Sequence, residues 1–128
     1  MGRAQSVMPM LSVDDLDNAV ALYGGILGGE PTYRFPPEGE PAFVVLRFGG
    51  SEVGLAVAGG SPPLHGRPTR PVTGHRIELC IYVDDVDAAV EAMRGAGVEV
   101  VVEPADMSWG ERIAYVADPD GNLVMLTV

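Results

Sequence analysis

The hydrophobic pattern divides the chain into two copies of one series of elements. Apolar and polar residues first alternate along a strand-like run, at residues 7–13 in one copy and 77–83 in the other. An aspartate cluster follows, which can cap a helix and favour its positive end. Apolar residues then recur at helical spacing, and glycines end the predicted helices at Gly24-Gly25 and Gly28-Gly29, and at Gly95 and Gly97.

Three further strand-like runs complete each copy. They cover residues 31–35, 42–48 and 52–57 in the first copy and residues 98–103, 112–117 and 122–128 in the second. The order is therefore βαβββ twice, which predicts an α+β fold of two tandem βαβββ modules. Module one spans about residues 6–57 and module two residues 76–128. A linker rich in Gly, Pro and Arg joins them at residues 58–75.

The two copies also match residue by residue. VDDLDNAV at residues 13–20 recurs as VDDVDAAV at 83–90, and GSEVGLAV at 50–57 recurs as GNLVMLTV at 121–128. Two distant matches at nearly the same spacing indicate a duplicated module.

Composition limits the class of protein. A chain of 128 residues has the size of one domain, and its net charge of −10 disfavours nucleic acid and anionic membranes as partners. A single cysteine, Cys80, excludes an internal disulfide and suits a reducing compartment. No apolar run is long enough to span a membrane, and Asp14 and Asp15 interrupt any candidate signal peptide. We therefore expect a soluble, cytoplasmic protein.

The repeated motifs resemble the vicinal oxygen chelate superfamily, which includes glyoxalase I, bleomycin-resistance proteins and extradiol dioxygenases. The resemblance rests on MLSVDD at 10–15, AVALY at 19–23, ILG at 26–28, WGER at 109–112 and ADPDGN at 117–122, and it covers nearly the whole chain. It implies sheets that curl into cups, usually completed by dimerisation, so a homodimer is expected. This fold supports several chemistries as well as pure binding.

The resemblance also locates the metal-ligand positions of the family's enzymes, on the first and fourth strand of each module. Here they hold Met8, Gly54, Glu78 and Met125. Thioethers suit only soft ions, and one carboxylate cannot hold a divalent cation alone. Strand alternation points His75 away from Glu78, and both His65 and His75 are expected to be solvated linker residues. We therefore expect no metal and no cofactor, as in the bleomycin-resistance branch.

Strand alternation predicts a cup lined by methionine and aromatic side chains. Trp109 precedes a strand and is expected to be exposed to a ligand or partner, while Tyr33 and Phe35 either line a rim of the cup or anchor a loop. The predicted ligand-binding residues are Met8, Met10, Tyr33, Phe35, Phe43, Arg47, Glu78, Cys80, Tyr82, Trp109 and Met125. The alternative is that the methionines and aromatic residues only fill a core, and that Trp109 packs against the neighbouring module. Cys80 has no histidine nearby on its strand, so a buried, inert thiol is expected rather than a nucleophile.

Two functions of different classes fit these features. The first is a binding protein that sequesters a bulky aromatic or cationic natural product and so confers drug resistance. Such a protein needs no catalytic residue. The second is a metal-independent lyase or isomerase that uses Glu78 as a general base. An enzyme whose metal ligands lie at other positions is a third possibility.

Overall fold

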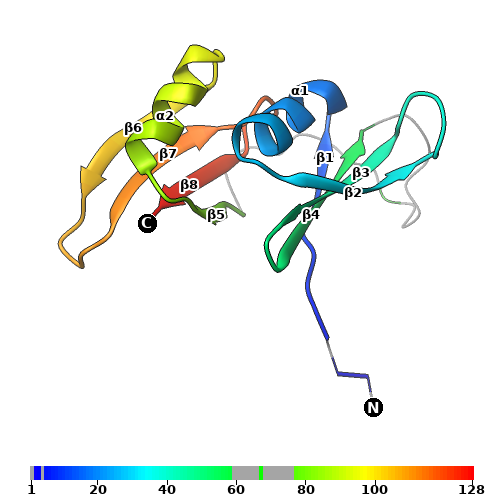
Figure 1. Ribbon diagram of the computed structural model, residues 1–128, viewed down its shortest axis with the longest axis horizontal. Helices are drawn as coiled ribbons and strands as arrows, with labels where there is room; N and C mark the ends of the chain where they lie inside the picture. The colour runs from blue at the N-terminus through cyan, green and yellow to red at the C-terminus, as the bar shows by residue number, and fades with distance from the viewer. Residues whose placement is uncertain (1, 4, 59–66, 68–76) are drawn as a thin grey trace. The chain divides into compact units, whose positions relative to one another are not determined.

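The computed structural model describes residues 2–3, 5–58, 67 and 77–128, and the chain divides into two compact units, Met1–Thr69 and Arg70–Val128 (Figure 1). Each unit contains one four-stranded mixed sheet with a helical segment. The predicted α+β class and the βαβββ order of both modules are confirmed. Both histidines and most of the predicted linker lie outside the described residues.

The first unit consists of β1 (Met10–Val13), α1 (Leu16–Val20), η1 (Ala21–Ile26), β2 (Glu30–Phe35), β3 (Phe43–Phe48) and β4 (Ser51–Val57). The strands lie in the order β1-β4-β3-β2, so β2 forms an edge of the sheet. The first strand runs parallel to β4 and the other pairs are antiparallel. In this register Gly54 lies between Met10 on one side and Val45 on the other.

The second unit repeats this topology. It consists of β5 (Leu79–Tyr82), α2 (Val86–Gly95), β6 (Glu99–Asp106), β7 (Arg112–Ala117) and β8 (Leu123–Thr127), with the strand order β5-β8-β7-β6. Met125 lies between Cys80 and Tyr115, as Gly54 lies between its two neighbours in the first unit. The register of the duplicated strands is therefore the same in both units.

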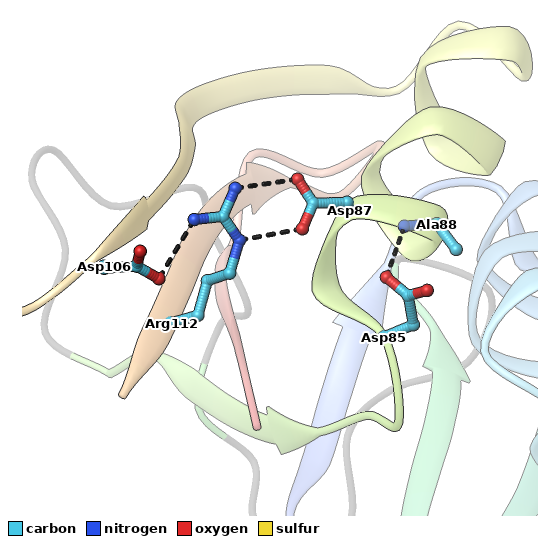
Figure 2. A network of polar contacts seen from close by, with 5 residues as sticks. All are labelled: Asp85, Asp87, Ala88, Asp106 and Arg112. Carbon is cyan, nitrogen blue, oxygen red and sulfur yellow. Dashed lines mark hydrogen bonds and ion pairs between the residues drawn. The ribbon is translucent and has the colours of Figure 1, made fainter. Parts of the chain in front are cut away.

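The aspartate clusters cap both helices as predicted. The Asp15 carboxylate accepts a hydrogen bond from the Asn18 backbone N–H at 3.1 Å. Asp85 accepts one from the Ala88 N–H at 3.0 Å (Figure 2). Each cap satisfies a backbone donor that has no partner within the helix.

Both Gly24-Gly25 and Gly28-Gly29 were predicted to end the first helix, and the helix ends only just before the second pair. It continues through Gly24-Gly25 as a π-helix, η1, in which the Leu27 N–H donates to the Leu22 carbonyl at 3.0 Å. The wider turn brings Gly29 against the ring of Phe48, where a Cβ would lie 2.7 Å from Cζ. Only glycine fits this close approach, which fixes the exit from the helix.

Both first strands begin later than predicted. Strand β1 begins at Met10 because Pro9 has no N–H to donate, although its carbonyl accepts from the Gly54 N–H at 2.9 Å. Strand β5 begins at Leu79. Met8 and Glu78 therefore lie just before the strands on which they were predicted. Strand β6 instead extends three residues further than expected, to Asp106.

Each sheet has one covered face and one open face. The covered faces carry the fully buried core side chains, including Val13 and Leu55 in the first unit and Val124 and Leu126 in the second. The opposite faces leave large apolar side chains exposed, among them Met10, Tyr33, Phe35 and Tyr82. Among the described residues, no helix has the length and apolar character needed to cross a bilayer.

Candidate functional site

The open face of the first unit centres on Gly54, which lies beneath an aromatic ring. A Cβ at this position would lie 3.0 Å from Cε1 of Phe43 and 3.3 Å from Cγ of Met10. The half-buried Phe43 ring also contacts Tyr33 edge-on, with ring centroids 6.1 Å apart and an interplanar angle of 63°. Strands β1, β2 and β3 thus contribute Met10, Tyr33 and Phe43 to one continuous apolar surface.

The remaining predicted residues of the first unit lie around this surface. Phe35 pairs with Phe43 across β2 and β3 and is exposed. Arg47 is exposed further along β3, where its guanidinium lies 3.8 Å from the Glu52 carboxylate. Met8 is half-buried and precedes β1. The structure therefore brings Met10, Tyr33 and Phe43 together directly.

The open face of the second unit carries a row of side chains across three strands. Cys80, Met125 and Tyr115 are register neighbours on β5, β8 and β7. The Tyr115 hydroxyl donates to Oε1 of Glu78 at 2.9 Å. This hydrogen bond, with partial burial and the Glu78 charge, raises the pKa of Tyr115. Tyr115 therefore stays protonated at neutral pH and is a hydrogen-bond donor.

A second carboxylate, that of Glu111, holds the tryptophan at this face. Its Oε1 accepts from Nε1 of Trp109 at 2.7 Å, and its Oε2 accepts from the Thr127 hydroxyl at 3.0 Å. Thr127 is fully buried, whereas Trp109 remains 66% exposed. Glu111 thus links the indole of Trp109 to Thr127 in the sheet by hydrogen bonds, and the exposed indole ring can contact a ligand.

The prediction that Cys80 is buried is wrong. The thiol is exposed, because it lies on the open face of β5 while α2 packs on β6 and β7. Partial burial raises the pKa of Cys80, and the carboxylates of Glu111 and Glu78 raise it further. The thiol therefore stays protonated at neutral pH and is a weak nucleophile, as the sequence indicated.

Glu111 and Tyr115 were missed among the candidate residues. Strand alternation from residue 111 to 117 contains the signal, because Glu111, Ile113 and Tyr115 share one parity while Ala114 and Val116 share the other. Ala114 and Val116 are fully buried on the covered face, so alternation assigns the first set to the opposite face, although Ile113 is also buried there. The same rule that selected residues on the other strands would have found both.

The four positions that correspond to metal ligands do not fit a divalent cation. Met8 and Met125 offer thioethers, Gly54 offers no side chain, and Glu78 already accepts a hydrogen bond from Tyr115. Within the described ranges, no three His, Cys, Asp or Glu side chains lie close enough together to bind a metal. The open faces instead present aromatic rings, thioethers and two carboxylates.

The sequence model of the Glyoxalase/Bleomycin resistance protein/Dioxygenase superfamily matches residues 5–126. The chain belongs to this superfamily. Protein Mb0911c of Mycobacterium bovis is 31% identical to this chain over 91% of this chain and 78% of its own length. A lactoylglutathione lyase of Haemophilus influenzae is 32% identical over 91% of this chain and 87% of its own length.

Solved structures of the superfamily share the fold. The crystal structure of TioX from Micromonospora sp. ML1 superposes with a TM-score of 0.74 at 26% identity, covering 97% of this chain and 98% of TioX. The resemblance seen in the motifs is therefore confirmed for the family and for the fold. Neither comparison distinguishes an enzyme from a binding protein, because this fold supports both.

Proposed function

We propose that this superfamily member binds a bulky aromatic or cationic small molecule without a metal and sequesters it unchanged. The observation that carries the proposal is the ring of Phe43 over Gly54. A position that corresponds to a metal ligand has no side chain here, and an aromatic ring covers the space in which a ligand side chain would extend. The site therefore offers a stacking surface where a metalloenzyme needs a donor atom.

The surroundings of Gly54 support an apolar, planar ligand. Met10 is 62% exposed on this face, and Tyr33 and Phe35 are also exposed, on the edge strand β2. Unbranched thioether side chains adapt to irregular shapes, and aromatic rings stack on flat ones. Exposed apolar side chains gathered on one sheet face are typical of an interaction site.

The charges on the open face of the second unit suit a cationic ligand at that face. Glu78 and Glu111 bond to neutral donors, and neither has a basic partner among the described residues. The chain as a whole carries a net charge of −10, which attracts cations over a distance. A cation placed against Glu78 gains a charge-assisted hydrogen bond.

The Glu78–Tyr115 pair favours a second candidate function, that of a metal-independent lyase or isomerase. A carboxylate next to a hydroxyl donor can remove a proton while the hydroxyl stabilises a developing oxyanion. The Haemophilus relative is named a lactoylglutathione lyase, which supports this class of reaction as a candidate. Turnover that depends on Glu78 would favour this candidate over sequestration.

A fluorescence screen tests the proposal. Trp109 is the only tryptophan in the chain, so its emission reports on ligands at the second unit's open face. We expect aromatic natural products, cationic ones above all, to quench it in protein dialysed against a chelator. Mass spectrometry should recover the compound unchanged, and expression of the protein should raise the concentration at which a toxic ligand inhibits growth. A modified compound, with the modification lost in Glu78→Gln, would establish the enzyme instead.

A further inference from the structure

The second unit places a guanidinium between its helix and its sheet. Arg112, at the start of β7, donates from Nε and one terminal nitrogen to the Asp87 carboxylate at 2.7 and 2.9 Å. Its other terminal nitrogen donates to Asp106 at 3.0 Å (Figure 2). These bonds lower the pKa of Asp87 and raise that of Arg112. The arginine thus links the first turn of α2 to two strands.

The first unit retains the helix carboxylate of this arrangement. Asp17 stands two residues after the helix cap Asp15, as Asp87 stands two residues after the helix cap Asp85. Asp17 is exposed, and no hydrogen bond or ion pair joins its carboxylate to another described residue. The first unit therefore keeps the carboxylate that accepts hydrogen bonds from a guanidinium in the second unit, but this carboxylate bonds to no guanidinium among the described residues.

The strands of the first unit lack the arginine. Val45 is paired with Gly54 as Tyr115 is paired with Met125, so the duplicated strands can be aligned residue by residue. Ala42 then takes the place of Arg112. On the edge strand β2, Phe35 pairs with Phe43 as Ala105 pairs with Ile113 in the second unit. The next residue, Pro36, therefore corresponds to Asp106.

A groove of about 480 Å³ lies between α1 and β2, and Asp17 is part of its lining. Its lining residues are Leu16, Asp17, Val20, Pro31, Thr32, Tyr33, Arg34, Pro41 and Val44. Arg34 is the basic residue of the lining, and its guanidinium donates to the backbone carbonyls of Pro36 and Gly39. The groove therefore combines an apolar lining, one carboxylate without a partner and an arginine engaged elsewhere.

We propose that this groove binds a small molecule in which a guanidinium or amidinium group is attached to an apolar body. The cation would bond to Asp17 as Arg112 bonds to Asp87, and the body would lie against Leu16, Val20 and Val44. The volume is within the range of ligand pockets, roughly 300–1,000 Å³. A guanidinium or amidinium can donate two parallel hydrogen bonds to both oxygens of a carboxylate, whereas an ammonium ion cannot. The Asp17 carboxylate should therefore favour the former over the latter.

This site is distinct from the aromatic surface around Gly54. Val44 lines the groove, whereas its neighbour Phe43 covers Gly54, and successive residues of a strand point to opposite faces. Asp17 and Val44 of the groove therefore lie on the opposite face of the first sheet from the Phe43 ring, and Tyr33 on the edge strand β2 borders both sites. The groove can bind a cation whether or not the open face binds an aromatic ligand, so the two proposals can fail separately.

Titration with benzamidine tests the site, and benzamide, its uncharged isostere, is the control probe. We expect benzamidine to shift the backbone amide resonances of α1 and β2 and to bind at least tenfold more tightly than benzamide. Asp17→Asn should weaken benzamidine at least tenfold, while Asp84→Asn, the same change at an exposed position of the second unit, should leave it unchanged.

A gain-of-arginine variant makes the test independent of any loss of folding. Ala42→Arg should place a guanidinium in the groove, abolish benzamidine binding and leave the circular dichroism spectrum unchanged. Equal affinity for benzamidine and benzamide would show an apolar cavity without cation recognition and would overturn the proposal. Unchanged binding in Asp17→Asn, shifts confined to the second unit, or no binding at millimolar benzamidine would overturn it as well.

Discussion

Trp109 is the residue whose removal should most clearly separate ligand binding from folding. Its indole is held by a single hydrogen bond to Glu111, and 66% of its surface is exposed. Truncation to alanine therefore removes little buried area from the folded protein. We expect Trp109→Ala to change the free energy of unfolding by no more than about 0.5 kcal/mol, as is usual for surface positions.

The effect on ligand binding should be much larger. A tryptophan side chain has about 250 Å² of surface, and two-thirds of it is about 160 Å². A flat ligand on one ring face covers about half of that, and 80 Å² at ~25 cal/mol per Å² corresponds to about 2 kcal/mol. Stacking adds ~0.5–1.5 kcal/mol, while buried area converts only partly into affinity. The dissociation constant should therefore rise at least tenfold, the equivalent of ~1.4 kcal/mol.

Isothermal titration calorimetry with the compound found in the fluorescence screen measures this loss without relying on the indole signal. Trp109→Phe is the matched control, because it retains a ring for stacking but loses the N–H that bonds to Glu111. Its affinity should fall between those of the original protein and Trp109→Ala. An unchanged dissociation constant in Trp109→Ala would refute the placement of the ligand against this ring.

Three other predictions concern folding, protonation and assembly. Gly29→Ala should lower the free energy of unfolding by about 1–2 kcal/mol in urea titrations, because its Cβ would lie 2.7 Å from Phe48, whereas Gly25→Ala meets nothing within 4 Å and should be neutral or stabilising. The pKa of Tyr115, measured by ¹³C NMR, should lie above the ordinary tyrosine value and should fall in Glu78→Gln. Because the pKa is raised in the folded protein, the Tyr115–Glu78 hydrogen bond stabilises the fold at pH values below the ordinary tyrosine pKa. This stabilisation is lost as the pH rises through the raised pKa. Light scattering should give a homodimer, since the open apolar faces suit a partner, and the mass of one 13.4 kDa chain at micromolar concentration would contradict this.

The fold could be predicted from the sequence because the duplication repeats every structural signal. The aspartates that cap α1 and α2 are local signals, and each acts within a few residues of its position. Strand alternation likewise depends only on neighbouring residues; it predicted that Met10 and Tyr82 face away from the helices, and both are exposed. The π-helix through Gly24-Gly25 was not predictable in this way, because it depends on the packing of Gly29 against Phe48, a residue far away in the sequence.

The candidate site was predictable only in part, for the same reason. The four positions that correspond to metal ligands in the family's enzymes could be located from the resemblance and by counting along the repeats. The ring of Phe43 over Gly54 and the link from Trp109 through Glu111 to Thr127 join different strands. Such contacts follow from sheet register and rotamers, which the sequence pattern does not contain. Cys80 was misjudged because alternation gives a residue's face but not whether another element covers that face.

The affinity of the screened ligand with and without divalent metal tests the central claim most directly. Calorimetric titrations would compare protein dialysed against a chelator with the same protein supplied with one equivalent of zinc, nickel or manganese. Because Met8, Gly54 and Met125 provide no hard donor atoms, we predict the same dissociation constant in all four samples. Binding that appears only when a metal is added would contradict the account.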